Sequence, residues 1–224
     1  MINARKDVGS IMTVDTQYLN DLNVEVNKKL KRFRFSAPDE TGAEITYIAT
    51  KQKIHWPGNI DSLNFRYQMQ SLGIVERKVL RKGTQNYFRV VKRSGKLLRI
   101  DLFSAGRLDV IYLFHYEANK RYAFPFSQTG GFYPTYTQVQ VYDNHSQIVE
   151  NYMVRSLQIV HHTYTVKSSE HVDFRYINYV VGCQPQLIGI QEGYYKLGEH
   201  LTYVETYNNS NQIMGHLGFD RKEP

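Results

Sequence analysis

The chain has 224 residues, room for one large domain or two small ones, with a formal net charge of +7 and 18 tyrosines. A charged fraction of 22% with only 6 prolines excludes a disordered chain, and the lone Cys183 excludes an internal disulfide framework and a thiolate zinc site. No apolar run is long enough to span a bilayer and the N-terminus lacks the apolar stretch of a secretory signal, so we expect a cytoplasmic protein.

The first element expected along the chain is a short amphipathic helix within residues 14–29. Its apolar positions recur at a spacing near 3.6 residues, at Leu19, Leu22, Val26 and Leu30. We expect this helix and some lead-in strands to occupy residues 1–60. An antiparallel β-meander then follows over residues 61–224, in what we take to be one continuous domain.

The rest of the chain has the two-residue period of β-strands. Residues 63–70 alternate apolar and polar side chains without a break, which predicts a strand. Further strands are predicted over residues 86–92, 96–103, 107–116, 122–126, 135–142, 147–154, 157–166, 187–191, 201–207 and 212–217. Residues 171–181 fit neither period, so a strand and a helix both stay open there. Turns of two to four residues join most of these strands, and such neighbours must be antiparallel.

The fold class is therefore mainly β, or a β-rich α+β fold with one short helix. The sequence leaves two architectures open for the hairpins, an open extended sheet or a closed barrel.

Aromatic residues dominate one predicted hairpin. They stand at even-numbered positions, which we interpret as one aromatic face: Tyr112, Phe114, Tyr116, Tyr122, Phe124 and Phe126. Exposed tyrosines suit contacts with an extended peptide or a sugar, so Tyr112, Tyr116 and Tyr122 are candidate binding residues, together with the only tryptophan, Trp56. The alternative is an aromatic core of a sandwich or barrel.

Positive charge is concentrated in residues 76–99, where nine cations are opposed only by Glu76. The candidate binding residues in this basic ribbon are Arg89, Lys92, Arg93 and Arg99. Such a ribbon could attract an anionic partner, and Tyr87 and Phe88 could stack on nucleic-acid bases. The alternative is a solvated sheet face whose long basic stems cover apolar surface.

Catalytic motifs are absent from the sequence, with no phosphate-binding glycine loop and no nucleophile elbow. His115 and Glu117 are two residues apart on a predicted strand and should share a face, so they are weak candidates for an acid–base pair or simply form a hairpin rim. His161 and His162 are adjacent on a strand and should point to opposite faces, which argues against a shared metal ion. We expect no metal and no cofactor.

Two segments resemble a known family. Residues 92–99 followed by 104–107, and residues 141–151 with the run Ile148-Val149-Glu150-Asn151, are similar to hairpins of the β-meander domain in Gram-positive bacterial glycosyltransferases that modify serine-rich adhesins or teichoic acids. The resemblance covers about a quarter of the chain. It implies an extended antiparallel sheet that does no chemistry and binds the acceptor polypeptide or a partner subunit. This chain lacks the strand–helix alternation of a nucleotide-sugar domain, so the resemblance implies a module without its own active site.

Three functions follow as hypotheses. The first is a non-catalytic binding or assembly module for an extended polypeptide, a glycan or a glycosyltransferase subunit, with self-association through sheet edges as a further expectation. The second is a small-molecule-binding barrel or an enzyme with a His, Glu and Tyr site. The third is nucleic-acid binding through the basic ribbon. No membrane partner is expected.

Overall fold

The computed structural model describes residues 16–49, 76–133, 136–145, 148–168, 171–181, 186–196, 202–207 and 213–218. In these residues one helix, α1 (Thr16–Arg32), accompanies a single antiparallel sheet of 13 strands. The predicted strand over residues 63–70 and the candidate residue Trp56 lie outside the described residues. The mainly β fold class expected from the sequence is confirmed.

The order of the strands in the sheet is almost the same as their order in the chain. Their bounds are β1 (Glu44–Ala49), β2 (Glu76–Arg77), β3 (Tyr87–Arg93), β4 (Lys96–Ser104), β5 (Arg107–Glu117), β6 (Lys120–Phe126), β7 (Thr137–Tyr142), β8 (Ile148–Arg155), β9 (Gln158–Ser168), β10 (His171–Val180), β11 (Gln186–Lys196), β12 (Thr202–Tyr207) and β13 (Ile213–Gly218). Each strand pairs with the next, except that β1 lies between β2 and β3. The described strands form an open sheet that ends at β2 and β13, so the open architecture is the one observed.

Tight turns produce this meander. Ser94 and Gly95 join β3 to β4, and Ala105 and Gly106 join β4 to β5, all four with positive φ. Two consecutive residues of positive φ match the right-handed twist of the strands they connect, and glycine adopts this conformation without strain. The predicted hairpins of this region are therefore confirmed. Residues 171–181, which the sequence left open, form strand β10.

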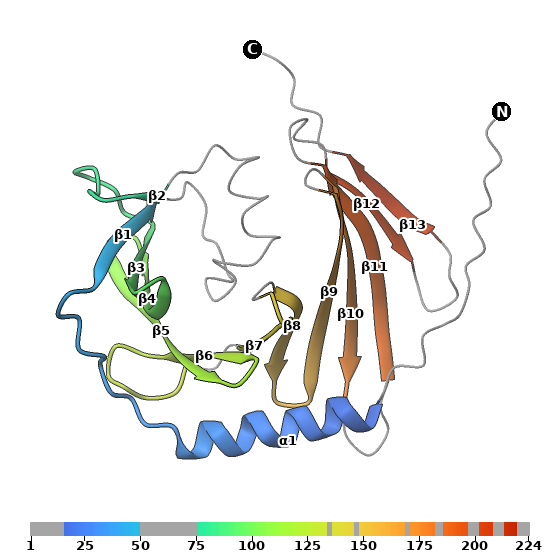
Figure 1. Cartoon of the computed structure of the whole chain (residues 1–224), viewed down its shortest axis with the longest axis horizontal. Helices are drawn as coiled ribbons and strands as arrows, with labels where there is room; N and C mark the ends of the chain where they lie inside the picture. The colour runs from blue at the N-terminus through green and yellow to red at the C-terminus, as the bar shows by residue number, and fades with distance from the viewer. Residues whose placement is uncertain are drawn as a thin grey trace, which may run out of the picture.

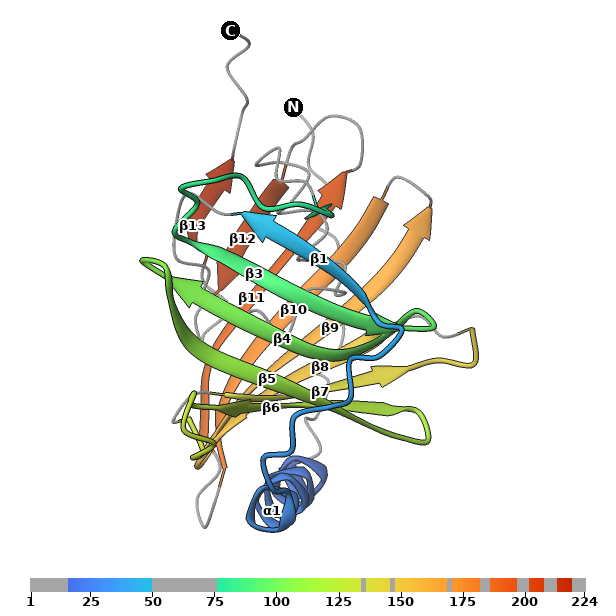
Figure 2. The same cartoon turned by 90° about the vertical axis from the view of Figure 1, so that its left-hand side faces the viewer.

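The sheet is strongly curved, so that β1–β5 face β9–β13 across its interior (Figures 1 and 2). Helix α1 lies outside the curve, beneath the strands at its base (Figure 1). We call the side of the sheet that α1 covers the helix face, and the opposite side the inner face.

The helix predicted from the sequence is confirmed. Leu19, Leu22 and Val26 are buried against a core that includes Phe124 of β6 and Ile159 of β9, and Leu30 packs at its margin. Burial of such an apolar stripe is what holds a short helix on a sheet. In the part of the chain that the structure describes, no helix combines the length and apolarity needed to cross a bilayer.

The inner face has its own apolar core, with Phe88 and Ile100 on one arm and Tyr112 of β5 near the base. The six even-numbered aromatic residues do not share a face, which corrects the sequence-based interpretation. Register is the reason: Tyr122 lies opposite His115 and not opposite a neighbouring even-numbered position. Tyr112, Phe114 and Tyr116 therefore lie on the inner face, and Tyr122, Phe124 and Phe126 on the helix face.

Candidate functional site

A row of polar side chains crosses the inner face at the base of the curve. Strand register places Arg121 of β6 opposite Gln140 of β7, Gln140 opposite Asn151 of β8, and Asn151 opposite His162 of β9. Directly opposite residues on neighbouring antiparallel strands project on the same side, so these four side chains form one continuous line. We call them the polar row. Gln138 lies two residues before Gln140, shares its face and is counted as a fifth member of the row.

The polar row is buried. The exposed fraction is 4% for Arg121, 1% for Gln138 and Gln140, 0% for Asn151 and 5% for His162. Buried polar groups of this kind normally have hydrogen-bond partners, because each group left without one costs about 1–3 kcal/mol.

Most of the row's amide groups lack such partners. The Arg121 guanidinium donates to Gln140 Oε1. Among the described residues, no group bonds either amide atom of Gln138 or of Asn151, the Gln140 Nε2 or the His162 Nδ1. Six donor or acceptor atoms on one face are thus buried without a described hydrogen-bond partner.

Aromatic rings flank both ends of the row. The Arg121 guanidinium carbon lies 5.3 Å from the ring centre of Phe114 and 5.7 Å from that of Tyr142. At the other end, the ring centres of His162 and Tyr176 are 4.1 Å apart. These ring contacts restrict the Arg121 guanidinium and the His162 imidazole, because either group would lose its contacts on rotating.

The imidazole of His162 is uncharged at neutral pH. Burial lowers its pKa to about 3, and the neighbouring His161 adds a smaller effect in the same direction. A base so weak is poorly matched to proton transfer near pH 7, and amide side chains do not transfer protons. The side chains of the row are therefore suited to hydrogen bonding and poorly suited to proton transfer.

The predicted pair His115 and Glu117 does share a face, with His115 Nε2 2.9 Å from Glu117 Oε1. Both side chains are exposed, and the same carboxylate also bonds Lys29 of α1. The hydrogen bond from Lys29, followed by that from His115, lowers the pKa of Glu117. This carboxylate thus joins the end of α1 to β5, as expected for a hairpin rim.

The three candidate tyrosines are buried or bonded within the chain. Tyr112 and Tyr122 are 2% and 0% exposed, and Tyr122 OH donates to Glu25 of α1. Tyr116 OH donates to the Leu97 carbonyl at 3.0 Å, with the Lys96 ammonium 5.6 Å from its ring centre. Tyr122 and Tyr112 belong to the two cores and Tyr116 is bonded to the backbone of β4, so the three do not form an exposed aromatic platform.

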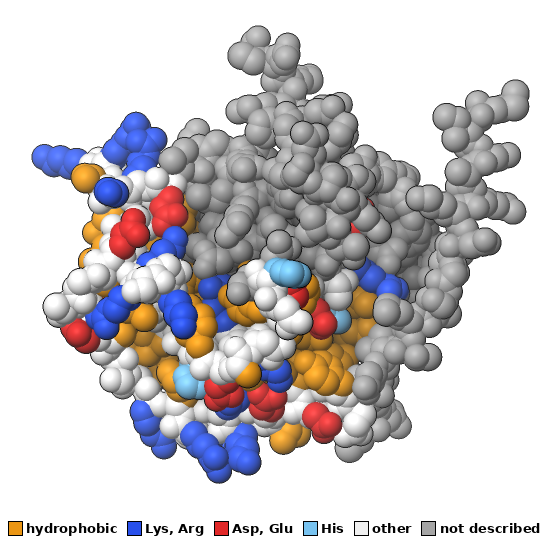
Figure 3. All heavy atoms as spheres, in the orientation of Figure 1, with side chains coloured by type: hydrophobic (Ala, Val, Ile, Leu, Met, Phe, Trp, Pro, Cys, Tyr) orange, Lys and Arg blue, Asp and Glu red, His pale blue; other side chains and the backbone are white. Residues whose placement is uncertain are grey.

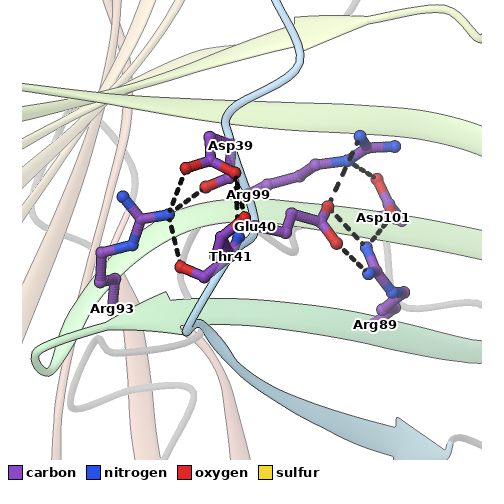
Figure 4. Close-up of polar contacts among 7 residues, drawn as sticks. All are labelled: Asp39, Glu40, Thr41, Arg89, Arg93, Arg99 and Asp101. Carbon is purple, nitrogen blue, oxygen red and sulfur yellow. Dashed lines mark hydrogen bonds and ion pairs between the residues drawn. The ribbon is translucent and has the colours of Figure 1, made fainter.

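The three candidate arginines of the basic ribbon have acidic partners within the chain (Figure 4). Arg89 and Arg99 both bond Asp101, at 3.1 and 2.6 Å, and both lie beside Glu40. Arg93 bonds the Thr41 carbonyl at 3.0 Å and lies 3.4 Å from Asp39.

Lys92 completes this set, 3.2 Å from Glu76. These pairings join β3 and β4 to residues 39–41 and to β2. The positive charge of these four cations on β3 and β4 is therefore largely neutralised by acidic groups of the same chain.

Sequence analysis did not identify the polar row. The run Gln138-Val139-Gln140-Val141 alternates as a half-exposed strand does, so its glutamines were indistinguishable from solvent-facing residues. The expectation for the histidine pair is confirmed: His161 bonds Glu150 on the helix face, whereas His162 lies on the inner face. Within the described residues, no three His, Cys, Asp or Glu side chains gather as metal ligands would.

Comparisons of this chain with protein-family models, with curated proteins and with solved structures found no match.

Proposed function

We propose that this protein is a non-catalytic binding module whose ligand is held by the polar row. The observation that carries the proposal is the set of buried amide groups of Gln138, Gln140 and Asn151 that bond no described group. A ligand rich in donors and acceptors would satisfy them and recover the free energy lost by their burial.

The chemistry of the row favours a glycan as this ligand. A hydroxyl group both donates and accepts, as an amide does, and aromatic rings next to amides suit the apolar faces of sugars. An extended polypeptide would bind a sheet through a backbone ladder. The backbones of β6–β9 are already paired on both sides where the row crosses them, so a peptide strand cannot be added there.

Two further points support the proposal. His162 stays neutral, so the row presents hydrogen-bonding groups with only one cation, which suits an uncharged ligand. The resemblance to the non-catalytic meander domain of glycosyltransferases supports a sheet that binds without catalysis, in a cytoplasmic protein associated with glycan transfer.

Binding to an array of uncharged glycans, followed by titration calorimetry on the best ligand, tests the proposal. Asn151→Leu keeps the shape of the side chain and removes both amide atoms, so affinity should fall at least about tenfold. Met153→Leu, a change of similar size on the same inner face, should leave affinity unchanged.

Two outcomes would contradict the proposal. One is that no glycan binds the wild-type protein. The other is that a bound glycan is lost equally from the Asn151→Leu and Met153→Leu variants, because the row's hydrogen bonds would then play no part. Binding of an extended peptide that is insensitive to Asn151→Leu would assign the ligand to a sheet edge instead.

A further inference from the structure

The chain between β2 and β3 projects from one end of the sheet (Figure 1). Residues 77–82 of this segment read Arg-Lys-Val-Leu-Arg-Lys, and we call them the basic tip. Lys and Arg side chains gather on the projection, at the upper left of the molecule (Figure 3). All four cations of the tip are exposed. Val79 is 76% exposed, the highest value among the large hydrophobic side chains that the structure describes.

No acidic group of the described residues neutralises the charge of the basic tip, in contrast to the charge of the cations on β3 and β4. No described residue forms an ion pair with any of the four cations of the tip, which are Arg77, Lys78, Arg81 and Lys82. The acid next to the tip, Glu76, accepts from Thr46 Oγ1 and lies 3.2 Å from Lys92. Four exposed cations without a described acidic partner therefore flank one exposed apolar side chain in the sequence.

The tip is held in a defined position. The backbone N–H and the hydroxyl of Thr84 donate to the Arg81 carbonyl, at 3.2 and 2.8 Å, across a turn in which Gly83 has a φ of 84°. Just beyond the turn, Gly106 N donates to the Gln85 carbonyl at 2.8 Å and ties the segment to the turn between β4 and β5. A partner would thus meet a surface that is already ordered.

We propose that the basic tip docks the protein on the surface of an anionic lipid bilayer. Lys and Arg are attracted to anionic headgroups, and an apolar side chain between them can enter the boundary of the acyl chains. This contact is peripheral and requires no membrane-spanning segment.

The alternative partner, a nucleic acid, would be held by the same cations together with aromatic rings that stack on bases. Among the described residues, the aromatic rings beside the tip pack against one another or are buried: Tyr47, opposite Arg77 in the sheet, contacts the ring of Tyr87, with centres 6.2 Å apart. Phe88 is fully buried, and the ring of Tyr87 stacks on that of Phe103, with centres 4.4 Å apart. The exposed Val79 is instead explained by an apolar environment, which a bilayer supplies.

Co-sedimentation of the full chain with vesicles tests this proposal. We expect binding to vesicles of equal parts phosphatidylcholine and phosphatidylglycerol, loss of binding in high salt, and none to phosphatidylcholine alone. Replacing Arg77, Lys78, Arg81 and Lys82 together by Gln should reduce the partition coefficient at least about tenfold. Val79→Ser should reduce it about two- to fivefold with the charge unchanged.

The matched control removes four exposed cations elsewhere, by replacing Lys28, Lys31, Arg32 and Arg34 at the end of α1 with Gln. This variant has the same net charge as the tip variant and should still bind the vesicles. Equal losses in both variants would overturn the proposal, because net charge alone would then explain binding. Retention by the tip variant, or tip-dependent binding of duplex DNA that Val79→Ser leaves unchanged, would also overturn it.

Discussion

Asp101 and Asn151 are both almost completely buried, but only Asp101 has its hydrogen-bonding atoms occupied by other side chains. Its two carboxylate oxygens accept from Arg89 and Arg99, whereas both amide atoms of Asn151 bond no described group. A buried polar residue with all its partners supports the fold, and one without them lowers stability unless something else bonds it. This difference separates a structural cluster from the site we propose.

Asp101→Asn should destabilise the protein, because it removes the charge that two half-buried guanidinium groups face. We expect the free energy of unfolding to fall by about 2 kcal/mol in urea titrations. Glu117→Gln is the matched control, since Glu117 is 44% exposed in its ion pairs and should contribute less than about 1 kcal/mol. Equal effects of the two substitutions would show that the Arg89–Asp101–Arg99 cluster does not stabilise the fold.

His162 should make stability depend on pH. The unfolded chain takes up a proton at this residue below pH 6.5, the ordinary histidine value, whereas the folded protein does so only near pH 3. Stability supplied by the neutral imidazole is therefore lost as the pH falls through this window, by up to about 1.4 kcal/mol per pH unit.

Urea unfolding at pH 7 and at pH 5 checks this expectation. The wild-type protein should lose about 2 kcal/mol more between the two pH values than His162→Gln does. Identical losses would mean that His162 reaches solvent in the folded protein and is not a neutral member of the polar row.

At the scale of single elements, α1 shows how an apolar stripe determines where a helix packs. Leu22 is 2% exposed beneath the sheet, whereas Val24, two residues later, is 65% exposed. Leu22→Ala should lower the free energy of unfolding by about 3 kcal/mol, through lost burial and the cavity left behind. Val24→Ala should change it by less than about 0.5 kcal/mol. Similar values for the two variants in urea titrations would place α1 away from the sheet.

The elements were predictable where local chemistry decides them. The stripe from Leu19 to Leu30 and the Ser94-Gly95 turn follow from side-chain spacing and backbone preference alone. The faces of β5 and β6 were not predictable, because the register across Glu117 and Lys120 decides which side Tyr122 occupies. The conformation of β10 was also undecided from the sequence. It is fixed by pairing with β9 and β11 and not by the spacing of the apolar residues in β10 itself.

At the scale of the whole molecule, the polar row shows why a site of this kind escapes sequence analysis. Gln140, Asn151 and His162 are about eleven residues apart in sequence and come together only because three consecutive strands pair in this register. Each residue alone looks like a solvent-facing position on a two-sided sheet. The curvature that turns this face inward is a property of the complete meander (Figure 2).

The arrangement of the whole molecule also explains why the cations on β3 and β4 have acidic partners and those of the basic tip do not among the described residues. Residues 39–41 lie far from residues 89–101 in sequence, but the fold brings them against β3 and β4, where their acidic groups and carbonyls bond the cations. The tip between β2 and β3 has no such neighbour among the described residues. Charge counted along the chain therefore does not identify the surface that is left positive.

The stability of the unliganded protein tests most directly whether the buried amides are retained for a ligand. Gln138→Met combined with Asn151→Leu replaces four amide atoms that bond no described group by apolar atoms of similar shape. Urea unfolding should show this double variant to be more stable than the wild-type protein by about 1–2 kcal/mol, because the cost of burying those amides is removed. A double variant that is less stable than the wild type by about 2 kcal/mol or more, with Met153→Leu unaffected, would show that these side chains support the fold and would contradict the binding site.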